Sequence, residues 1–115
     1  MSPATLVVEC PVGGREGQQV IQLIGRLTLE SVFRFEQTLK ENEAPSTIVD
    51  LSQVEFIDSA GLGSLVMAHT AHERAGRRLA LVGVTERTAK LLSIAGLTPV
   101  LTIFDTVEKA EEALA

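Results

Sequence analysis

Short apolar runs rich in β-branched residues alternate with helix-like segments along most of the chain, and this alternation constrains the fold most strongly. The first two runs are Thr5–Cys10 and Gln19–Ile24. A short loop containing Pro11, Gly13 and Gly14 separates them, so we expect a β-hairpin. Strands that alternate with helices are joined by right-handed crossovers and form a parallel sheet. The sequence therefore predicts an α/β fold, with a mixed, mostly parallel sheet of about five strands and about four helices packed on it.

Capping and helix-breaking residues mark the ends of the predicted elements. The predicted helices cover, in order, Leu29 to about Glu43, Ser59 or Ala60 to Ala75, Thr85–Ala95 and the segment after Asp105 or Thr106. The predicted strands after the hairpin are Thr47–Leu51, Leu79–Val82 and Val100–Phe104, with residues 52–58 as a connecting turn that ends extended. Apolar positions of the first two helices include Leu29, Val32, Phe33, Leu39, Leu62, Leu65, Val66 and Met67. We expect Gly25 to end the second strand, Thr28 to cap the first helix and Gly76 to end the second.

The composition argues against several functional classes. The 115 residues include 15 acidic and 10 basic side chains, a formal net charge of −5, whereas a nucleic-acid-binding protein needs a basic surface. The single Cys10 cannot form an internal disulfide or a cysteine-based zinc cluster. The first residues lack the pattern of a signal peptide, and no apolar run approaches the roughly 18 residues that span a membrane. We expect one domain over residues 1–115, in the cytoplasm, with no nucleic-acid partner and no membrane insertion.

The most informative segment leads from the predicted buried strand at Thr47–Leu51 into Asp58-Ser59-Ala60-Gly61-Leu62-Gly63, where the second helix should begin. A helix N-terminus has unpaired backbone N–H groups and a partial positive charge, and it favours anions. The Ser59 hydroxyl is well placed there to carry a phosphate, with Gly61 and Gly63 keeping the bulk around it low. The residues alone leave two interpretations open. Either Asp58 or Ser59 is only an N-cap and the glycines only permit tight packing, or Ser59 is functional.

The same segment resembles a known family. Asp58-Ser59-Ala60-Gly61-Leu62-Gly63, preceded by Phe56-Ile57, is similar to the signature of bacterial anti-sigma factor antagonists with the STAS fold. The resemblance continues in Ile48–Ser52, Leu79–Val84, Lys90–Leu92 and Ala95–Leu97, and it implies a single STAS-type domain. In that family the serine after the aspartate is the phosphoacceptor, which corresponds here to Ser59. The resemblance further implies partner binding at Asp58, Ser59, Ala60, Gly61, Leu62, Gly63, Arg26 and Thr28.

The function implied by the resemblance is partner switching. In that family the unphosphorylated antagonist binds an anti-sigma factor with GHKL-type serine kinase activity, and a sigma factor is released. Phosphorylation of the serine ends the interaction, and a PP2C-type phosphatase resets it. The protein is then a substrate and a binding partner rather than an enzyme, with no catalytic residues, metal or cofactor of its own.

One turn differs from the family pattern. Family members often carry an acidic Gly-Glu-x-Asp turn after the second strand, where this chain has Gly25-Arg26-Leu27-Thr28. In the family that turn borders the kinase-binding surface, so losing two acids and gaining one base leaves the identity of the partner open. The alternative function is a STAS adaptor subunit of an ABC lipid transporter, or of another signalling assembly, in which Ser59 is not phosphorylated.

Two further patterns indicate phosphate chemistry more weakly. Gly61-x-Gly63 follows a strand, as in a nucleotide-binding fingerprint, but Val66 stands where the third glycine belongs. Asp50 lies at a strand end, like the phosphorylated aspartate of receiver domains. Those domains need an acidic cluster after the first strand to hold magnesium, and Cys10-Pro11-Val12 supplies none.

Two histidines invite comparison with metal sites. His69 and His72 lie three residues apart, with Glu73 adjacent, and this spacing matches neither metalloprotease motif. No third ligand is evident, so we interpret both as solvated or partly packed imidazoles. Cys10, with no activating base near it in the sequence, is interpreted as a small strand residue.

Overall fold

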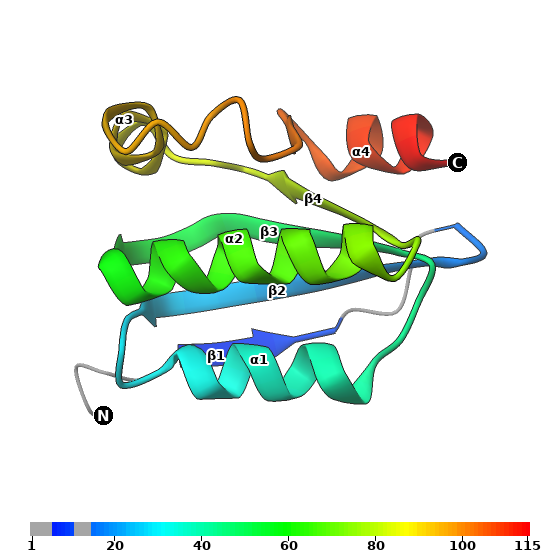
Figure 1. The fold of residues 1–115 in the computed structure, drawn as a ribbon, viewed down its shortest axis with the longest axis horizontal. Helices are drawn as coiled ribbons and strands as arrows, with labels where there is room; N and C mark the ends of the chain where they lie inside the picture. The colour runs from blue at the N-terminus through cyan, green and yellow to red at the C-terminus, as the bar shows by residue number, and fades with distance from the viewer. Residues whose placement is uncertain (1–5, 11–14) are drawn as a thin grey trace.

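The computed structural model describes residues 6–10 and 15–115 and shows a five-stranded sheet with helices on both faces (Figure 1). The strands lie in the sheet in chain order and are β1 (Leu6–Glu9), β2 (Gln18–Leu27), β3 (Ser46–Ile57), β4 (Arg78–Val82) and β5 (Ile103–Phe104). β1 pairs antiparallel with β2, and the later neighbours pair in parallel. The predicted hairpin and the mixed, mostly parallel sheet are therefore confirmed. The predicted strand start at Thr5 and the loop residues Pro11, Gly13 and Gly14 lie outside the described residues.

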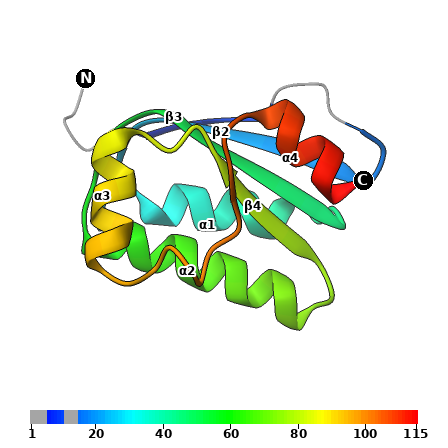
Figure 2. The same cartoon turned by 90° about the horizontal axis from the view of Figure 1, so that it is seen from above.

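The helices follow the predicted order. They are α1 (Val32–Glu41), α2 (Ser59–Arg74), α3 (Glu86–Ile94) and α4 (Val107–Leu114). α1 and α2 lie side by side on one face of the sheet, whereas α4 lies on the other face (Figure 2). Because both cross between parallel strands, α1 and α2 run in the same direction. Over residues 6–10 and 15–115, no helix combines the length and the apolar character needed to cross a membrane.

The core is aliphatic, as a chain with four Phe and no Trp or Tyr requires. Its larger cluster lies between the sheet and α1, α2 and α3, where Phe35 is the largest fully buried side chain. A smaller cluster joins the opposite face of the sheet to α4 through Ile48, Ala80, Val82, Ala110 and Leu114. Burying one such aliphatic side chain contributes about 1.5–3 kcal/mol, so apolar contact on both faces makes β3 the buried centre of the sheet.

Two strands are longer than predicted. Gly25 does not end β2: it adopts a φ of 110° at a register shift, and the strand continues to Leu27. Residues 52–57, predicted as a connecting turn that ends extended, form the second half of β3 and pair with this continuation of β2. Each extension satisfies the backbone groups of the other, so the ends of both strands depend on a contact between distant segments.

The start of the first helix is also different. Thr28 does not cap α1, which begins at Val32 rather than Leu29. The Ser31 hydroxyl instead donates to the Arg26 carbonyl (2.6 Å) and accepts from the Thr28 N–H (2.9 Å). These bonds close a turn over residues 28–31, and the helix starts only after it.

The last strand is shorter than predicted. β5 contains two residues, Ile103 and Phe104, instead of the five expected from Val100 onward. The N–H groups of Val100 and Leu101 both donate to the Leu97 carbonyl, so this part of the segment is a turn that cannot pair with β4. The Thr106 side chain caps α4, which confirms one of its two predicted cap positions.

Candidate functional site

The candidate site lies where the central strand β3 ends and α2 begins. Asp58 connects them in an extended conformation, and its carboxylate oxygen Oδ1 accepts a hydrogen bond from the Gly61 N–H at 2.8 Å. This is N-cap geometry, so the cap interpretation holds for Asp58. Ser59 is the first residue of the helix, where the sequence predicts it, and it is exposed.

Asp58 also binds the turn after β2. Its second oxygen, Oδ2, accepts from the Leu29 N–H at 3.0 Å, and its own N–H donates to the Leu27 carbonyl at 3.3 Å. Desolvation acts to raise the pKa of Asp58, but the N–H groups of Gly61, Leu29 and Ala60 together hold that pKa below its usual value. A charged carboxylate therefore fixes the start of α2 against the β2–α1 turn.

The two glycines of the motif have different surroundings. A Cβ on Gly61 would lie 2.2 Å from the Leu27 carbonyl oxygen and 2.9 Å from the Ile57 side chain. A Cβ on Gly63 would meet nothing within 4 Å in the described structure. Tight packing thus explains why position 61 is a glycine. At position 63 no described neighbour requires a glycine, and the missing side chain leaves open space on the outer side of α2.

Ser59 is the nucleophilic side chain that the site presents to solvent. Its hydroxyl makes no hydrogen bond to the residues that the structure describes, because Asp58 supplies the cap. A group carried by this hydroxyl lies at the positive end of the helix dipole, which favours an anion by about 0.3–1 kcal/mol at an exposed position. The geometry suits a phosphorylated serine, since the modification would disturb no internal contact.

The other predicted site residues are only partly exposed to solvent. Arg26 places its guanidinium 4.6 Å from the centre of the Phe56 ring, a cation–π contact between paired strands. Thr28 is 7% exposed, and its hydroxyl is buried without a hydrogen-bond partner among the described residues. Ala60 and Leu62 are half-buried, so exposure in the motif is concentrated at Ser59.

Sequence reasoning missed three exposed apolar side chains next to the motif. Leu29, Phe33 and Met67 belong by sequence to the apolar positions of the first two helices, yet all three lie largely in solvent. With α1 starting at Val32, its buried stripe runs through Phe35, so Phe33 falls outside this stripe. The spacing i, i+3, i+7 of Val32, Phe35 and Leu39, which pack in the core, is the signal that would have identified Phe33 as an outward residue.

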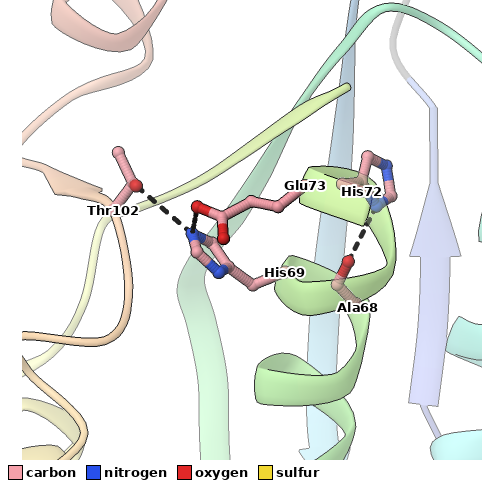
Figure 3. Close-up of polar contacts among 5 residues, drawn as sticks. All are labelled: Ala68, His69, His72, Glu73 and Thr102. Carbon is pink, nitrogen blue, oxygen red and sulfur yellow. Dashed lines mark hydrogen bonds and ion pairs between the residues drawn. The ribbon is translucent and has the colours of Figure 1, made fainter. Parts of the chain in front are cut away.

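The two histidines are buried in the second half of α2 and do not form a metal site (Figure 3). The His72 ring binds the Ala68 carbonyl through Nδ1 (2.8 Å) and the Thr47 hydroxyl through Nε2 (3.3 Å). The His69 Nε2 instead lies 3.4 Å from the Thr102 hydroxyl, on the other side of the helix. Within the described ranges, no group of three His, Cys, Asp or Glu residues could hold a metal ion.

These contacts correct the interpretation of the histidines as solvated or partly packed. Burial lowers the pKa of His72 below its usual value, against the opposing effect of its bond to the Ala68 carbonyl. A neutral ring that donates from Nδ1 and accepts at Nε2 satisfies both of its neighbours. His69 and His72 thus connect α2 to other elements as structural hydrogen-bonding groups.

The remaining candidates also have structural surroundings. The Asp50 Oδ1 accepts from the Ser52 N–H at 2.9 Å. A Cβ on Gly83 would lie 2.8 Å from the same oxygen, so this carboxylate faces a crowded strand end. Cys10 is an exposed free cysteine directly after β1.

The chain belongs to the STAS domain family, whose model matches residues 11–110. A similar curated protein from Thermotoga neapolitana, a candidate anti-sigma factor antagonist by its name, is 40% identical over 62 residues, 54% of this chain and 55% of that protein. The chain thus aligns with about half the length of the curated relatives it matches.

Solved structures share the fold over nearly the whole chain. An anti-sigma factor antagonist from Mycobacterium paratuberculosis is 21% identical, with a TM-score of 0.82 over 98% of this chain and 97% of that one. A sulfate transporter family protein from Wolinella succinogenes is 23% identical, with a TM-score of 0.78 over 89% and 88% of the two chains. The predicted STAS-type fold is confirmed, and the second structure illustrates that the fold alone does not specify a function.

Proposed function

We propose that this protein is an anti-sigma factor antagonist that acts by partner switching, with Ser59 as the phosphoacceptor. The observation that carries the proposal is the exposed Ser59 hydroxyl on the first residue of α2, released from capping by Asp58. The names of the related proteins support the class, and Asp58–Gly63 resembles the family's phosphoacceptor signature. On this proposal the protein acts in the cytoplasm as a single STAS domain.

In the proposed cycle the unphosphorylated protein binds an anti-sigma factor with GHKL-type serine kinase activity, and the sigma factor is released. The Ser59 hydroxyl oxygen then attacks the γ-phosphorus of ATP on the kinase. ADP leaves, the hydroxyl proton is lost and a phosphoserine remains. A PP2C-type phosphatase hydrolyses this ester and restores the hydroxyl. The chain supplies the acceptor and the binding surface, and the two partners supply the catalysis.

Electrostatics explain how one phosphate ends binding without unfolding the protein. The phosphate adds about −1.5 to −2 charges at pH 7 beside the Asp58 carboxylate, whose lowered pKa keeps it ionised. The N–H groups of the first turn of α2 offset part of this charge within the protein. A partner packed over Ser59 would have to desolvate both anions, and each 1.4 kcal/mol of that cost weakens binding about tenfold.

The direct test is phosphorylation by an anti-sigma factor kinase and ATP, followed by intact-mass spectrometry. The wild-type protein should gain one phosphate, and Ser59→Ala should gain none. Ser93→Ala, which alters an exposed serine of α3, is the matched control and should be phosphorylated like wild type. Stoichiometric phosphorylation of Ser59→Ala would contradict the site assignment.

A binding experiment tests the switch itself. Ser59→Asp should weaken binding to the kinase at least tenfold while leaving the circular dichroism spectrum unchanged. Equal affinities for wild type and Ser59→Asp would rule out switching by charge. Stable association with a transporter ATPase, with Ser59 unmodified, would instead support the adaptor function.

A further inference from the structure

Three long apolar side chains are exposed on or beside α1 and α2: Leu29 precedes α1, Phe33 lies in its first turn and Met67 lies near the middle of α2. Leu29 is 72% exposed, Phe33 is 70% exposed and Met67 is 71% exposed. α1 and α2 run in the same direction and begin at the same edge of the sheet, at the left of Figure 1. The hydrogen bond from the Leu29 N–H to Asp58 fixes the turn before α1 against the start of α2. The exposed side chains therefore belong to neighbouring parts of one surface.

This surface is continuous with Ser59. Residues 59, 63 and 67 are four apart, so Ser59, Gly63 and Met67 lie along one side of α2. Gly63 leaves open space between the other two, because nothing described lies within 4 Å of its missing Cβ. A partner that covers Ser59 can thus reach the α2 backbone at Gly63 and the side chain of Met67.

A groove between α1 and α2 extends the surface further. It has a volume of about 360 Å³, and its apolar walls come from Leu39, Met67, Ala68 and Ala71. Glu36, Lys40, Glu43 and Arg77 also line it. The buried polar residues Ser64 and His72 complete the lining, so the groove combines apolar, polar and charged walls.

We propose that Leu29, Phe33, Gly63, Met67 and this groove, together the α1–α2 surface, bind an amphipathic α-helix of the anti-sigma factor kinase. The inference rests on the proposed function and names the element that the partner contributes. An amphipathic helix recognises an elongated groove through apolar residues spaced i, i+3, i+4 and i+7. One large apolar residue of the partner helix sits over Gly63 between Phe33 and Met67, and another, one or two turns away, enters the groove.

Charge favours a different protein over a second copy of this chain. Each copy has a formal net charge of −5, so two copies repel each other. Glu36 on α1 and Glu43 just after its end line the groove together with Lys40 and Arg77, so they match a partner helix whose edges carry charges of both signs. A phosphate on Ser59 would stand at one end of this helix's path, so it would block the docking as well as add charge.

The test measures the affinity of the unphosphorylated protein for the anti-sigma factor kinase by isothermal titration calorimetry. Phe33→Ser and Met67→Ser should each weaken binding about tenfold, and Gly63→Arg should weaken it more, because its side chain fills the open space. Ile94→Ser is the matched control, since Ile94 is 77% exposed on α3, and it should bind like wild type. Thermal unfolding of each variant checks that the fold is retained.

Hydrogen exchange on the complex locates the contact. Amides from Leu29 to Glu36 and from Ala60 to Met67 should become protected on binding. Wild-type affinity in all three surface variants, or protection confined to the amides around Ser59, would overturn the α1–α2 surface and leave the proposed function standing. Failure of the wild-type protein itself to bind any anti-sigma factor kinase would remove the proposed function, and this inference with it.

Analytical ultracentrifugation addresses the competing occupant. Dimerisation of wild type that Phe33→Ser abolishes and Ile94→Ser preserves would assign the surface to a second copy and overturn the proposal. A monomer at all concentrations, together with the predicted loss of kinase binding, supports it.

Discussion

Polar side chains have opposite surroundings at the two ends of α2. At the start, Asp58 is bound by backbone N–H groups of two segments, and the neighbouring Ser59 hydroxyl is left in solvent. In the second half, His69 and His72 are buried and hydrogen-bonded to other elements. By residue type alone the histidines are the better catalysts, yet their surroundings make them structural.

The difference teaches that solvent exposure, rather than intrinsic reactivity, separates the proposed functional side chain, Ser59, from the structural histidines. A serine at a helix start usually caps the helix, and then its hydroxyl is occupied by the backbone. In this protein Asp58 caps α2 instead, so the helix start does not need the Ser59 hydroxyl as a cap. The following predictions test this division between the two ends of the helix.

The largest effect should come from Gly61. Gly61→Ala should lower the free energy of unfolding by about 3 kcal/mol, because the new methyl group would overlap the Leu27 carbonyl and force the start of α2 away from β2. Urea denaturation at pH 7 measures the change. A loss below about 0.5 kcal/mol, typical of an unconstrained surface site, would show that the contact is not tight.

The second-largest effect should be a loss of stability on mild acidification, caused by the buried His72 in the second half of α2. The pKa of His72 is lowered in the folded protein, so the unfolded chain binds its proton first as the pH falls. The stabilisation is complete above the usual histidine pKa of about 6.5 and is lost below it, by at most about 1.4 kcal/mol per pH unit for one proton. Stability curves between pH 7.5 and 5 for wild type and His72→Gln measure this, and the variant should show the shallower slope.

A smaller effect should arise at the cap. Asp58→Ala should cost about 1 kcal/mol at pH 7 through loss of the N-cap, whereas Asp58→Asn, which keeps a side-chain acceptor, should cost less. The Asp58 pKa is lowered on folding, so its ionic contribution is present above the usual carboxyl pKa of about 3.9 and disappears as the pH falls through the folded value. The gap between wild type and Asp58→Ala should therefore narrow only in strong acid, well below the range in which His72 acts.

The smallest effect should have the opposite sign. Gly63→Ala should raise the free energy of unfolding by up to about 1 kcal/mol, because alanine is the better helix former and its methyl group meets no neighbour. Parallel denaturation of Gly61→Ala and Gly63→Ala gives a matched pair two residues apart. A loss of stability in both variants would contradict the distinction between a packed and an open glycine.

The sequence predicts those parts of the fold that depend on local signals. The alternation of strands and helices, the central β3 and the start of α2 at Ser59 all follow from apolar periodicity and from one cap residue, and the structure confirms them. The length of β3 does not follow from local signals. Residues 52–57 form a strand only because β2 continues past Gly25 and pairs with them. The choice between Thr28 and Ser31 also depends on a tertiary turn, because both are hydroxyl residues just before the helix.

The candidate site was predictable to a similar extent. The motif identifies where Asp58, Ser59 and the two glycines lie, but it cannot distinguish Gly61 from Gly63, because the difference is a carbonyl more than thirty positions away in sequence. The burial of His69 and His72 could not be predicted from the sequence either, because their partners Thr102 and Thr47 lie far from them in the chain.

The attachment of α2 to the β2–α1 turn bears on how proteins of this kind diversify. The groups that Asp58 and Gly61 meet are the carbonyl of residue 27 and the N–H of residue 29, which nearly every amino acid supplies. Mutations that replace the side chains at positions 26 and 29 can therefore accumulate while Ser59 keeps its position at the start of α2. Under the proposed function, such changes would alter the surface that meets the partner and leave the position of Ser59 unchanged.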